Sequence, residues 1–118
     1  RYRKSFGVEV ESALTVLSTV TSRPTADRII CDAGFKATGN VSPDPELRNI
    51  SDCASIKFSA EHGIITLSKG TPQPRVGDTI EFVPGYSDSA IFLHEYLYGV
   101  RDGLVETVWP VIGRGKLQ

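Results

Sequence analysis

Short runs of alternating apolar and polar residues recur along the chain, and most of them end at a glycine or proline. The longest run covers 8–21 and is rich in β-branched residues. Because successive side chains point to opposite faces of a strand, this pattern predicts β-strands rather than helices. About seven short strands with frequent turns predict a mostly β fold, an antiparallel barrel-like or sandwich domain with one or two short helical turns.

The turn residues give these strands provisional limits. We expect the strand over 8–21 to be bent or bulged and to stop at 22–25, because Pro24 cannot donate to a ladder. Residues 38–52 include two prolines and predict an irregular loop with one helical turn near 46–48. Asp102-Gly103 predicts the tight turn of a hairpin. Further strands are expected at 27–32, 54–60, 64–67, 76–83, 96–100 and 104–108, with a short helical turn over 87–94.

Size and charge restrict the class of protein. The 118 residues predict one domain over 1–118, and a formal charge of −1 supports neither a nucleic-acid partner nor a polybasic membrane contact. The sequence has no apolar run near the roughly 20 residues that span a bilayer, so we expect a soluble cytoplasmic protein. The chain begins at Arg1 and has no Met, which favours a piece of something longer. Cys31 and Cys53 are expected to be small buried hydrophobic residues.

Polar side chains gather in 83–98, after a Pro-Gly corner. If the segment is extended, Tyr86 and Asp88 project from one face, because positions two apart in a strand share a side. A carboxylate there can hold a divalent cation, with Tyr86 as a neighbour or weak ligand. The alternative, which the spacing alone favours, is that Asp88 caps the next helical turn and Tyr86 packs on the surface.

Two histidines are secondary candidates for catalysis or metal binding. His62 in Glu-His-Gly is typical of a solvated turn, and a catalytic role is the alternative. His94 is a candidate metal ligand, but a histidine among apolar neighbours is more often packed with one ring nitrogen satisfied.

Several stretches together resemble the C-terminal domain of the D-serine dehydratase and D-threonine aldolase family, which are metal-activated, alanine-racemase-like pyridoxal-phosphate enzymes. The matching stretches keep the family's order across nearly all of the chain. They are Ala13-Leu14-Thr15-Val16-Leu17, Ser22-Arg23-Pro24, Asp32-Ala33-Gly34, Lys36-Ala37, Glu61-His62-Gly63, Arg75-Val76-Gly77-Asp78, Val83-Pro84-Gly85, Val108-Trp109-Pro110 and Arg114-Gly115.

This resemblance implies a β-domain beside a TIM-type barrel that carries the Schiff-base lysine and most pyridoxal phosphate contacts. That barrel is absent from the chain, so no cofactor-binding residue is expected here and the chain is expected to be inactive alone. The implied parent is a lyase of aldolase or dehydratase type, a homodimer acting on a small D-3-hydroxy amino acid. The β-domain of such enzymes supplies a Mn²⁺ or Zn²⁺ site near the substrate hydroxyl.

The family's metal motif maps onto Pro84, Gly85 and Asp88, but it places Tyr86 where the family has histidine. A neutral phenol is a poorer ligand than imidazole, and its pKa is about 10. His62 or His94 could replace the missing ligand. Two other functions stay open: a structural or dimerisation module with a degenerate metal site, and an amino-acid racemase relative in which Tyr86 acts as an acid or base.

Overall fold

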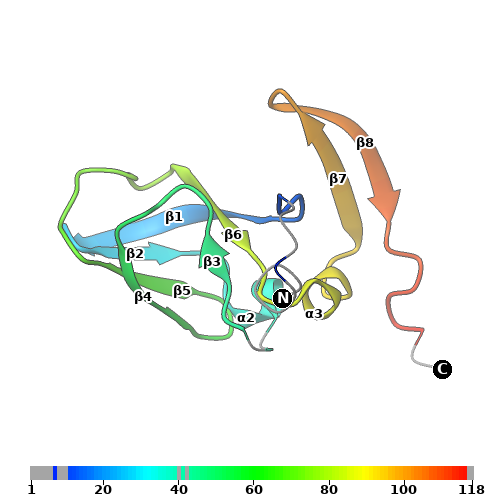
Figure 1. Ribbon diagram of the computed structural model, residues 1–118, viewed down its shortest axis with the longest axis horizontal. Helices are drawn as coiled ribbons and strands as arrows, with labels where there is room; N and C mark the ends of the chain where they lie inside the picture. The colour runs from blue at the N-terminus through cyan, green and yellow to red at the C-terminus, as the bar shows by residue number, and fades with distance from the viewer. Residues whose placement is uncertain (1–6, 8–10, 40, 42, 117–118) are drawn as a thin grey trace.

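The computed structural model describes residues 7, 11–39, 41 and 43–116. Its larger part is a six-stranded sheet that curls into a nearly closed barrel, and each neighbouring pair of strands is antiparallel (Figure 1). The strand order is β3-β6-β1-β2-β5-β4. The other described elements are a separate hairpin of two strands and two short helices. This architecture confirms the mostly β, barrel-like prediction. The elements are β1 (Val16–Thr25), β2 (Arg28–Cys31), α2 (Phe35–Thr38), β3 (Glu46–Leu47), β4 (Cys53–Phe58), β5 (Gly63–Leu67), β6 (Thr79–Val83), α3 (Ser87–Ile91), β7 (Tyr96–Arg101) and β8 (Leu104–Pro110).

The core lies inside the curled sheet, where alternate residues of its strands meet. Ile29 of β2 pairs with Ile65 of β5, and both are fully buried. Phe58 and Phe82 meet edge to face with ring centroids 5.5 Å apart. Burying each large apolar side chain contributes about 1.5–3 kcal/mol. The buried cluster consists of Val16, Val20, Ile29, Cys31, Ala33, Ile65, Leu67, Ile80 and Phe82.

The first strand differs from its prediction at both ends. Residues 8–10 lie outside the described residues, and β1 continues through Pro24 to Thr25, so the predicted stop at 22–25 is wrong. The predicted bulge is confirmed, because the register against β2 shifts between Val20 and Ser22 and again between Ser22 and Thr25. Pro24 lies within the second irregular stretch, where a strand tolerates a residue without an N–H.

The segment 38–52 was predicted to be irregular, with a helical turn near 46–48. Most of its described residues are irregular as predicted, but Glu46 and Leu47 form β3, which pairs with the edge of β6 so that Leu47 lies opposite Phe82. The helical turn is therefore wrong, and the reason is a contact with a strand distant in sequence. The prediction also missed α2, whose first N–H groups are satisfied by the turn between β4 and β5. The Phe35 and Lys36 amides donate to the Ser59 and Ala60 carbonyls at 3.0 and 3.2 Å.

The remaining predicted strands are confirmed in β2, β4, β5, β6, β7 and β8 with shifted ends. In the last hairpin Asp102 and Gly103 have φ values of 50° and 78°, as a two-residue turn requires.

Cys31 is buried as predicted, whereas Cys53 is half-buried and burial raises the pKa of its thiol. None of the described helices is long and apolar enough to cross a membrane.

Asp32 at the end of β2 makes the fold sensitive to acid. Burial acts to raise the pKa of its carboxyl, but hydrogen bonds from the Thr19 amide (2.7 Å) and the Ser18 hydroxyl (2.8 Å) outweigh burial and lower it. Because the folded-state pKa is lowered, the Asp32 carboxylate stabilises the fold above the unfolded-state pKa of about 3.9. This stabilisation is lost as pH falls through the folded-state pKa. We expect the free energy of unfolding to fall less between about pH 5 and pH 2 in Asp32→Asn than in the original chain. Urea unfolding at several pH values measures this, and parallel curves for the two proteins would contradict it.

Candidate functional site

The candidate site begins at the corner that follows β6. Val83 ends the strand, and Pro84 and Gly85 turn the chain against the loop before β3. A Cβ atom on Gly85 would lie 1.5 Å from the Pro43 carbonyl oxygen, so only glycine allows this approach. The corner therefore has a defined position on the barrel, and it places Tyr86 at the start of α3.

Tyr86 is the N-cap residue of α3, in an extended conformation with φ −138° and ψ 109°. The predicted helical turn is present but ends at Ile91. The prediction that Asp88 caps it is wrong, because no side-chain cap hydrogen bond forms at this end within the described part of the chain. The Ser89 hydroxyl instead donates to the Tyr86 carbonyl at 2.9 Å. Since the chain becomes helical at Ser87, the strand geometry expected to put Tyr86 and Asp88 on one face does not apply.

Asp88 lies in the first turn of α3 and is exposed, whereas Tyr86 is half-buried. The Ser87 hydroxyl donates to the Asp88 Oδ1 at a long 3.3 Å. A carboxylate in the first turn is favoured by the partial positive charge of a helix N-terminus. The start of α3 thus carries a half-buried phenol and an exposed carboxylate two positions apart in the sequence.

His94 joins the two short helices. Its Nε2 lies 2.8 Å from the Ala37 carbonyl oxygen, and because a carbonyl only accepts, Nε2 carries the proton and donates. Gly39, with φ 80°, ends α2 against α3, where a Cβ would lie 2.6 Å from the Ser89 Oγ. His94 therefore holds α2 and α3 together, and only its Nδ1 is left for a ligand. Residue spacing could not reveal this link, because Ala37 and His94 are 57 positions apart.

His62 lies in the exposed turn between β4 and β5, as expected of a turn histidine. Its carbonyl accepts from the Ser59 amide at 2.9 Å, and its own amide donates to the Ser59 hydroxyl at 3.1 Å. The neighbouring Glu61 forms an ion pair with Lys36 of α2. Both partners are exposed, so the pair contributes less than about 1 kcal/mol. The ion pair nevertheless connects the turn to the helix that His94 contacts.

The described residues do not fit a self-contained metal site. Across 11–39, 41 and 43–116, no cluster of three or more His, Cys, Asp or Glu side chains could hold an ion. The first turn of α3 offers one carboxylate beside a phenol, and the His94 Nε2 is occupied by the Ala37 carbonyl. Structural and catalytic zinc sites use at least three protein ligands, most of them imidazole, thiolate or carboxylate.

This donor set predicts weak metal binding that one substitution strengthens. We expect Tyr86→His to tighten Zn²⁺ binding by at least about tenfold, or about 1.4 kcal/mol, because imidazole replaces a neutral phenol. Competition with a chromogenic chelator measures the affinity. Tyr98→His on the exposed hairpin is the matched control and should leave the affinity unchanged. Equal affinity in the original chain and in Tyr86→His would contradict the prediction.

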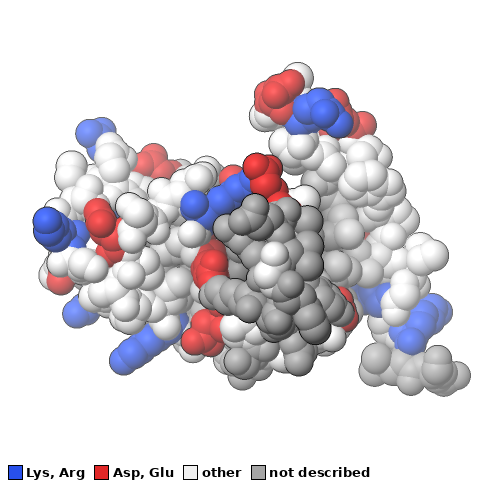
Figure 2. Space-filling model, viewed as in Figure 1, with Lys and Arg blue, Asp and Glu red and all other residues white. Residues whose placement is uncertain are grey.

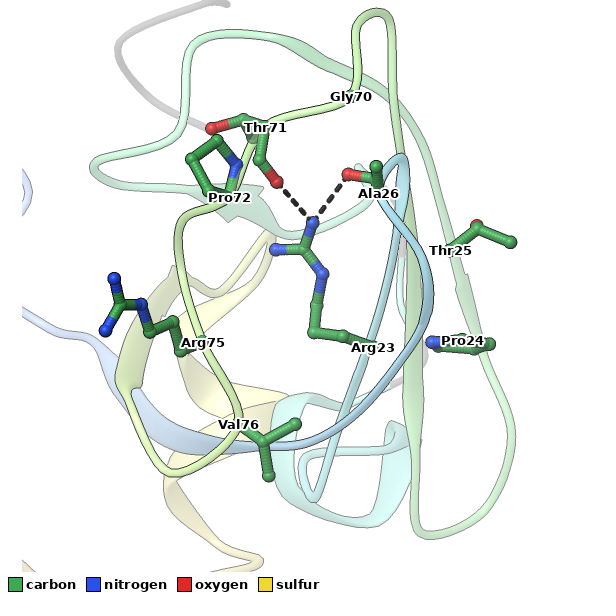
Figure 3. Close-up of a pocket in the computed structure, with 9 residues that line it drawn as sticks. All are labelled: Arg23, Pro24, Thr25, Ala26, Gly70, Thr71, Pro72, Arg75 and Val76. Carbon is green, nitrogen blue, oxygen red and sulfur yellow. Dashed lines mark hydrogen bonds between the residues drawn. The ribbon is translucent and has the colours of Figure 1, made fainter.

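A second concave region lies at the opposite end of the barrel, beside the β1–β2 turn (Figure 3). This cleft of about 610 Å³ includes Arg23, whose guanidinium points between two loops. It donates to three backbone carbonyls, those of Ala26, Thr71 and Pro74. Arg75 points away from it (Figure 3). The Nη1 and Nη2 donors of Arg23 thus join two loops of the protein, whereas its buried Nε has no partner among the described residues. We assign the cleft a structural role.

The family model and the relatives found by comparison with known proteins point to the same family. The family model described as "Putative serine dehydratase domain" matches residues 13–100. D-threonine aldolase of Arthrobacter sp is 36% identical over 105 residues, covering 89% of this chain and 28% of that protein. 3-Hydroxy-D-aspartate aldolase of Paracoccus denitrificans is 40% identical over 108 residues, covering 92% and 27%.

A solved structure agrees with these relatives. The crystal structure of D-threonine aldolase from Filomicrobium marinum matches with a TM-score of 0.88 and 29% identity, over 94% of this chain and 30% of that one. The chain thus spans less than a third of the length of the relatives it matches. The family match, the two relatives and the shared fold show that this chain belongs to the serine dehydratase-like domain family, the C-terminal domain of the D-threonine aldolase group.

Proposed function

We propose that this chain is the substrate-side domain of a pyridoxal-phosphate-dependent D-amino-acid lyase and is inactive without the cofactor-binding barrel. The observation that carries the proposal is the match of almost the whole chain to two aldolases of D-amino acids at 36% and 40% identity. The preferred substrate class is a small D-3-hydroxy amino acid, because both relatives are named for such substrates. When bound by the barrel, pyridoxal phosphate supplies the electron sink for cleavage next to the amino group.

The residues that this chain would contribute to the active site lie at the start of α3. Asp88 is exposed, and its side-chain carboxyl oxygens can accept a hydrogen bond from the substrate 3-hydroxyl. Tyr86 lies two residues earlier in the sequence, at the N-cap of α3, and is the second candidate for contact with the substrate. Retro-aldol cleavage requires the substrate 3-hydroxyl to lose its proton, which makes Asp88 the proposed proton acceptor. His94 is a positioning residue for α2 and α3, and His62 stays a secondary candidate.

A chimera tests the proposal. The homologous segment of the Arthrobacter D-threonine aldolase is replaced by this chain, and cleavage of D-threonine to glycine and acetaldehyde is measured. We expect the chimera to cleave D-threonine and the isolated chain not to. Asp88→Asn in the chimera should lower kcat by about 10²–10⁴-fold, the usual contribution of a general base. The folding stability should change little, because Asp88 is exposed.

The matched control is Asp52→Asn, which also removes an exposed carboxylate but lies in the loop before β4. It should leave kcat and the midpoint of thermal unfolding unchanged. If Asp88→Asn and Asp52→Asn have equal activity in a folded chimera, Asp88 has no catalytic role. Alanine racemisation without D-threonine cleavage would favour the racemase alternative, in which Tyr86 is the acid or base. A folded chimera without any activity would favour a structural module.

A further inference from the structure

The hairpin of β7 and β8 stands apart from the six-stranded barrel (Figure 1). In the described residues its two strands pair only with each other, from Tyr96 opposite Pro110 to Arg101 opposite Leu104. A hairpin of two strands is at best marginally stable in water unless another layer covers one face. The hairpin is therefore the element whose packing is least complete within this chain.

The two faces of the hairpin differ. Cross-strand partners share a face, so Leu97, Gly99, Thr107 and Trp109 lie on one side. On that side the indole of Trp109 lies over Gly99, where a Cβ would lie 2.9 Å from it, while Trp109 and Leu104 are themselves 53% and 71% exposed. The other side, which we call the tyrosine face, carries five large side chains that are each 47–61% exposed. They are Tyr96, Tyr98, Val100, Val105 and Val108.

Charged side chains are confined to the two ends of the hairpin. Figure 2 shows charge gathered at the tip and an uncharged surface along the strands below it. At the tip Arg101 pairs with Glu106, with Nε–Oε2 3.1 Å, and at the base Arg114 pairs with Glu95 at 3.0 Å. Monomeric proteins rarely leave a contiguous apolar patch of this kind in water, and a patch with a polar rim is typical of an interface.

We propose that the tyrosine face is a docking surface for the cofactor-binding domain of the enzyme, an inference that rests on the proposed function. The relatives named above extend beyond this segment by more than twice its length, since the chain covers 27–30% of each. This additional part of the relatives is the polypeptide that is available to cover the tyrosine face. The partner surface is uncharged and apolar, with acceptors for the two tyrosine hydroxyls at the rim.

Docking of the hairpin also determines where α3 lies. The Val111 amide donates to the Glu95 carbonyl at 2.8 Å, which closes the base of the hairpin immediately after His94. His94 is joined to Ala37 of α2, and α2 packs on α3. The hairpin, α3 and the barrel edge therefore form one connected unit. When the tyrosine face is covered, Tyr86 and Asp88 take a defined position relative to the covering domain.

Hydrogen exchange in the isolated chain and in the Arthrobacter chimera tests this inference. We expect backbone amides of 96–110 to exchange at least about tenfold more slowly in the chimera, because docking suppresses local opening. Amides of β2 and β5 should be protected in both proteins. The double substitution Tyr98→Lys and Val108→Lys should remove the added protection. Leu104→Lys, on the opposite face, is the matched control and should preserve it.

The same double variant is measured in the isolated chain, so the test does not depend on the folding of the chimera. There it should shift the midpoint of thermal unfolding by less than about 3 °C, as exposed substitutions do. A larger loss would show that the face packs within this chain and would overturn the inference. Sedimentation as a dimer with a protected hairpin would make a second copy the occupant and would also overturn it. Unchanged hydrogen exchange at 96–110 in a folded chimera would also overturn the inference. Added protection without D-threonine cleavage would instead refute only the proposed activity.

Discussion

Replacing Gly85 with alanine is expected to lower the free energy of unfolding by more than about 3 kcal/mol and to displace α3. The new Cβ would lie 1.5 Å from the Pro43 carbonyl oxygen and 3.2 Å from the Asp44 carbonyl carbon. Overpacking against a side chain typically costs about 1–3 kcal/mol because the side chain can move. Here the obstacle is backbone, so the corner or the loop before β3 must shift as a whole. Urea unfolding of the chain measures the loss.

Gly113→Ala is the control for the loss of glycine itself, because a Cβ at Gly113 would have no described atom within 4 Å. It should change the free energy of unfolding by less than about 1 kcal/mol. In the chimera, Gly85→Ala should also reduce D-threonine cleavage, since Tyr86 directly follows the corner. A Gly85→Ala chain as stable as the Gly113→Ala chain would show that the corner does not depend on this close approach.

Replacing Arg23 with methionine is expected to lower the free energy of unfolding by about 2–3 kcal/mol. The guanidinium is half-buried and donates to the carbonyls of Ala26, Thr71 and Pro74, with the bond to Thr71 at 2.7 Å (Figure 3). Hydrogen bonds to charged groups contribute about 1.5–3 kcal/mol each when buried, and partial exposure reduces the sum. Methionine keeps most of the apolar stem but leaves the three carbonyls without this donor.

Arg28→Met is the matched control, because Arg28 is exposed on β2 and has no side-chain hydrogen bond within the described ranges. It should cost less than about 0.5 kcal/mol. Arg23→Lys should recover only part of the loss, since a single ammonium lacks the planar fork that reaches several carbonyls. Faster hydrogen exchange at 70–76 should accompany Arg23→Met. Equal stability of Arg23→Met and Arg28→Met would refute the bridging role.

The two substitutions test opposite ends of the barrel with different consequences. Gly85 supports the corner that places Tyr86, so its loss should affect both stability and the activity of the chimera. Arg23 joins the β1–β2 turn to the 70–75 loop, far from α3 (Figure 1). Its loss should therefore lower stability, while the kcat of the chimera at a temperature where it stays folded should remain the same.

The candidate site was predictable in part. The corner at Pro84 and Gly85 is visible in the sequence because these residues have strong local preferences. The turn position of His62 also agrees with its prediction, whereas the predicted cap by Asp88 does not form. The environment of His94 was not predictable in detail, because its acceptor is the Ala37 carbonyl, 57 positions earlier. The part of the chain that the structure describes brings together too few ligands for a metal, a question that the spacing of Tyr86 and Asp88 left open.

The same division holds for the fold. Alternation in β2, β5 and β6 and the Asp102-Gly103 turn identify strands and a hairpin directly, because side-chain alternation and turn geometry act over a few residues. The sequence did not predict the short β3, the helix α2 or the continuation of β1 through Pro24, and only the tertiary structure shows them. These segments are held by partners far away in sequence: β3 pairs with β6, and the Arg23 guanidinium donates to the Pro74 carbonyl, 51 positions away. Local preference is weak in such segments, so contacts formed on folding decide their structure.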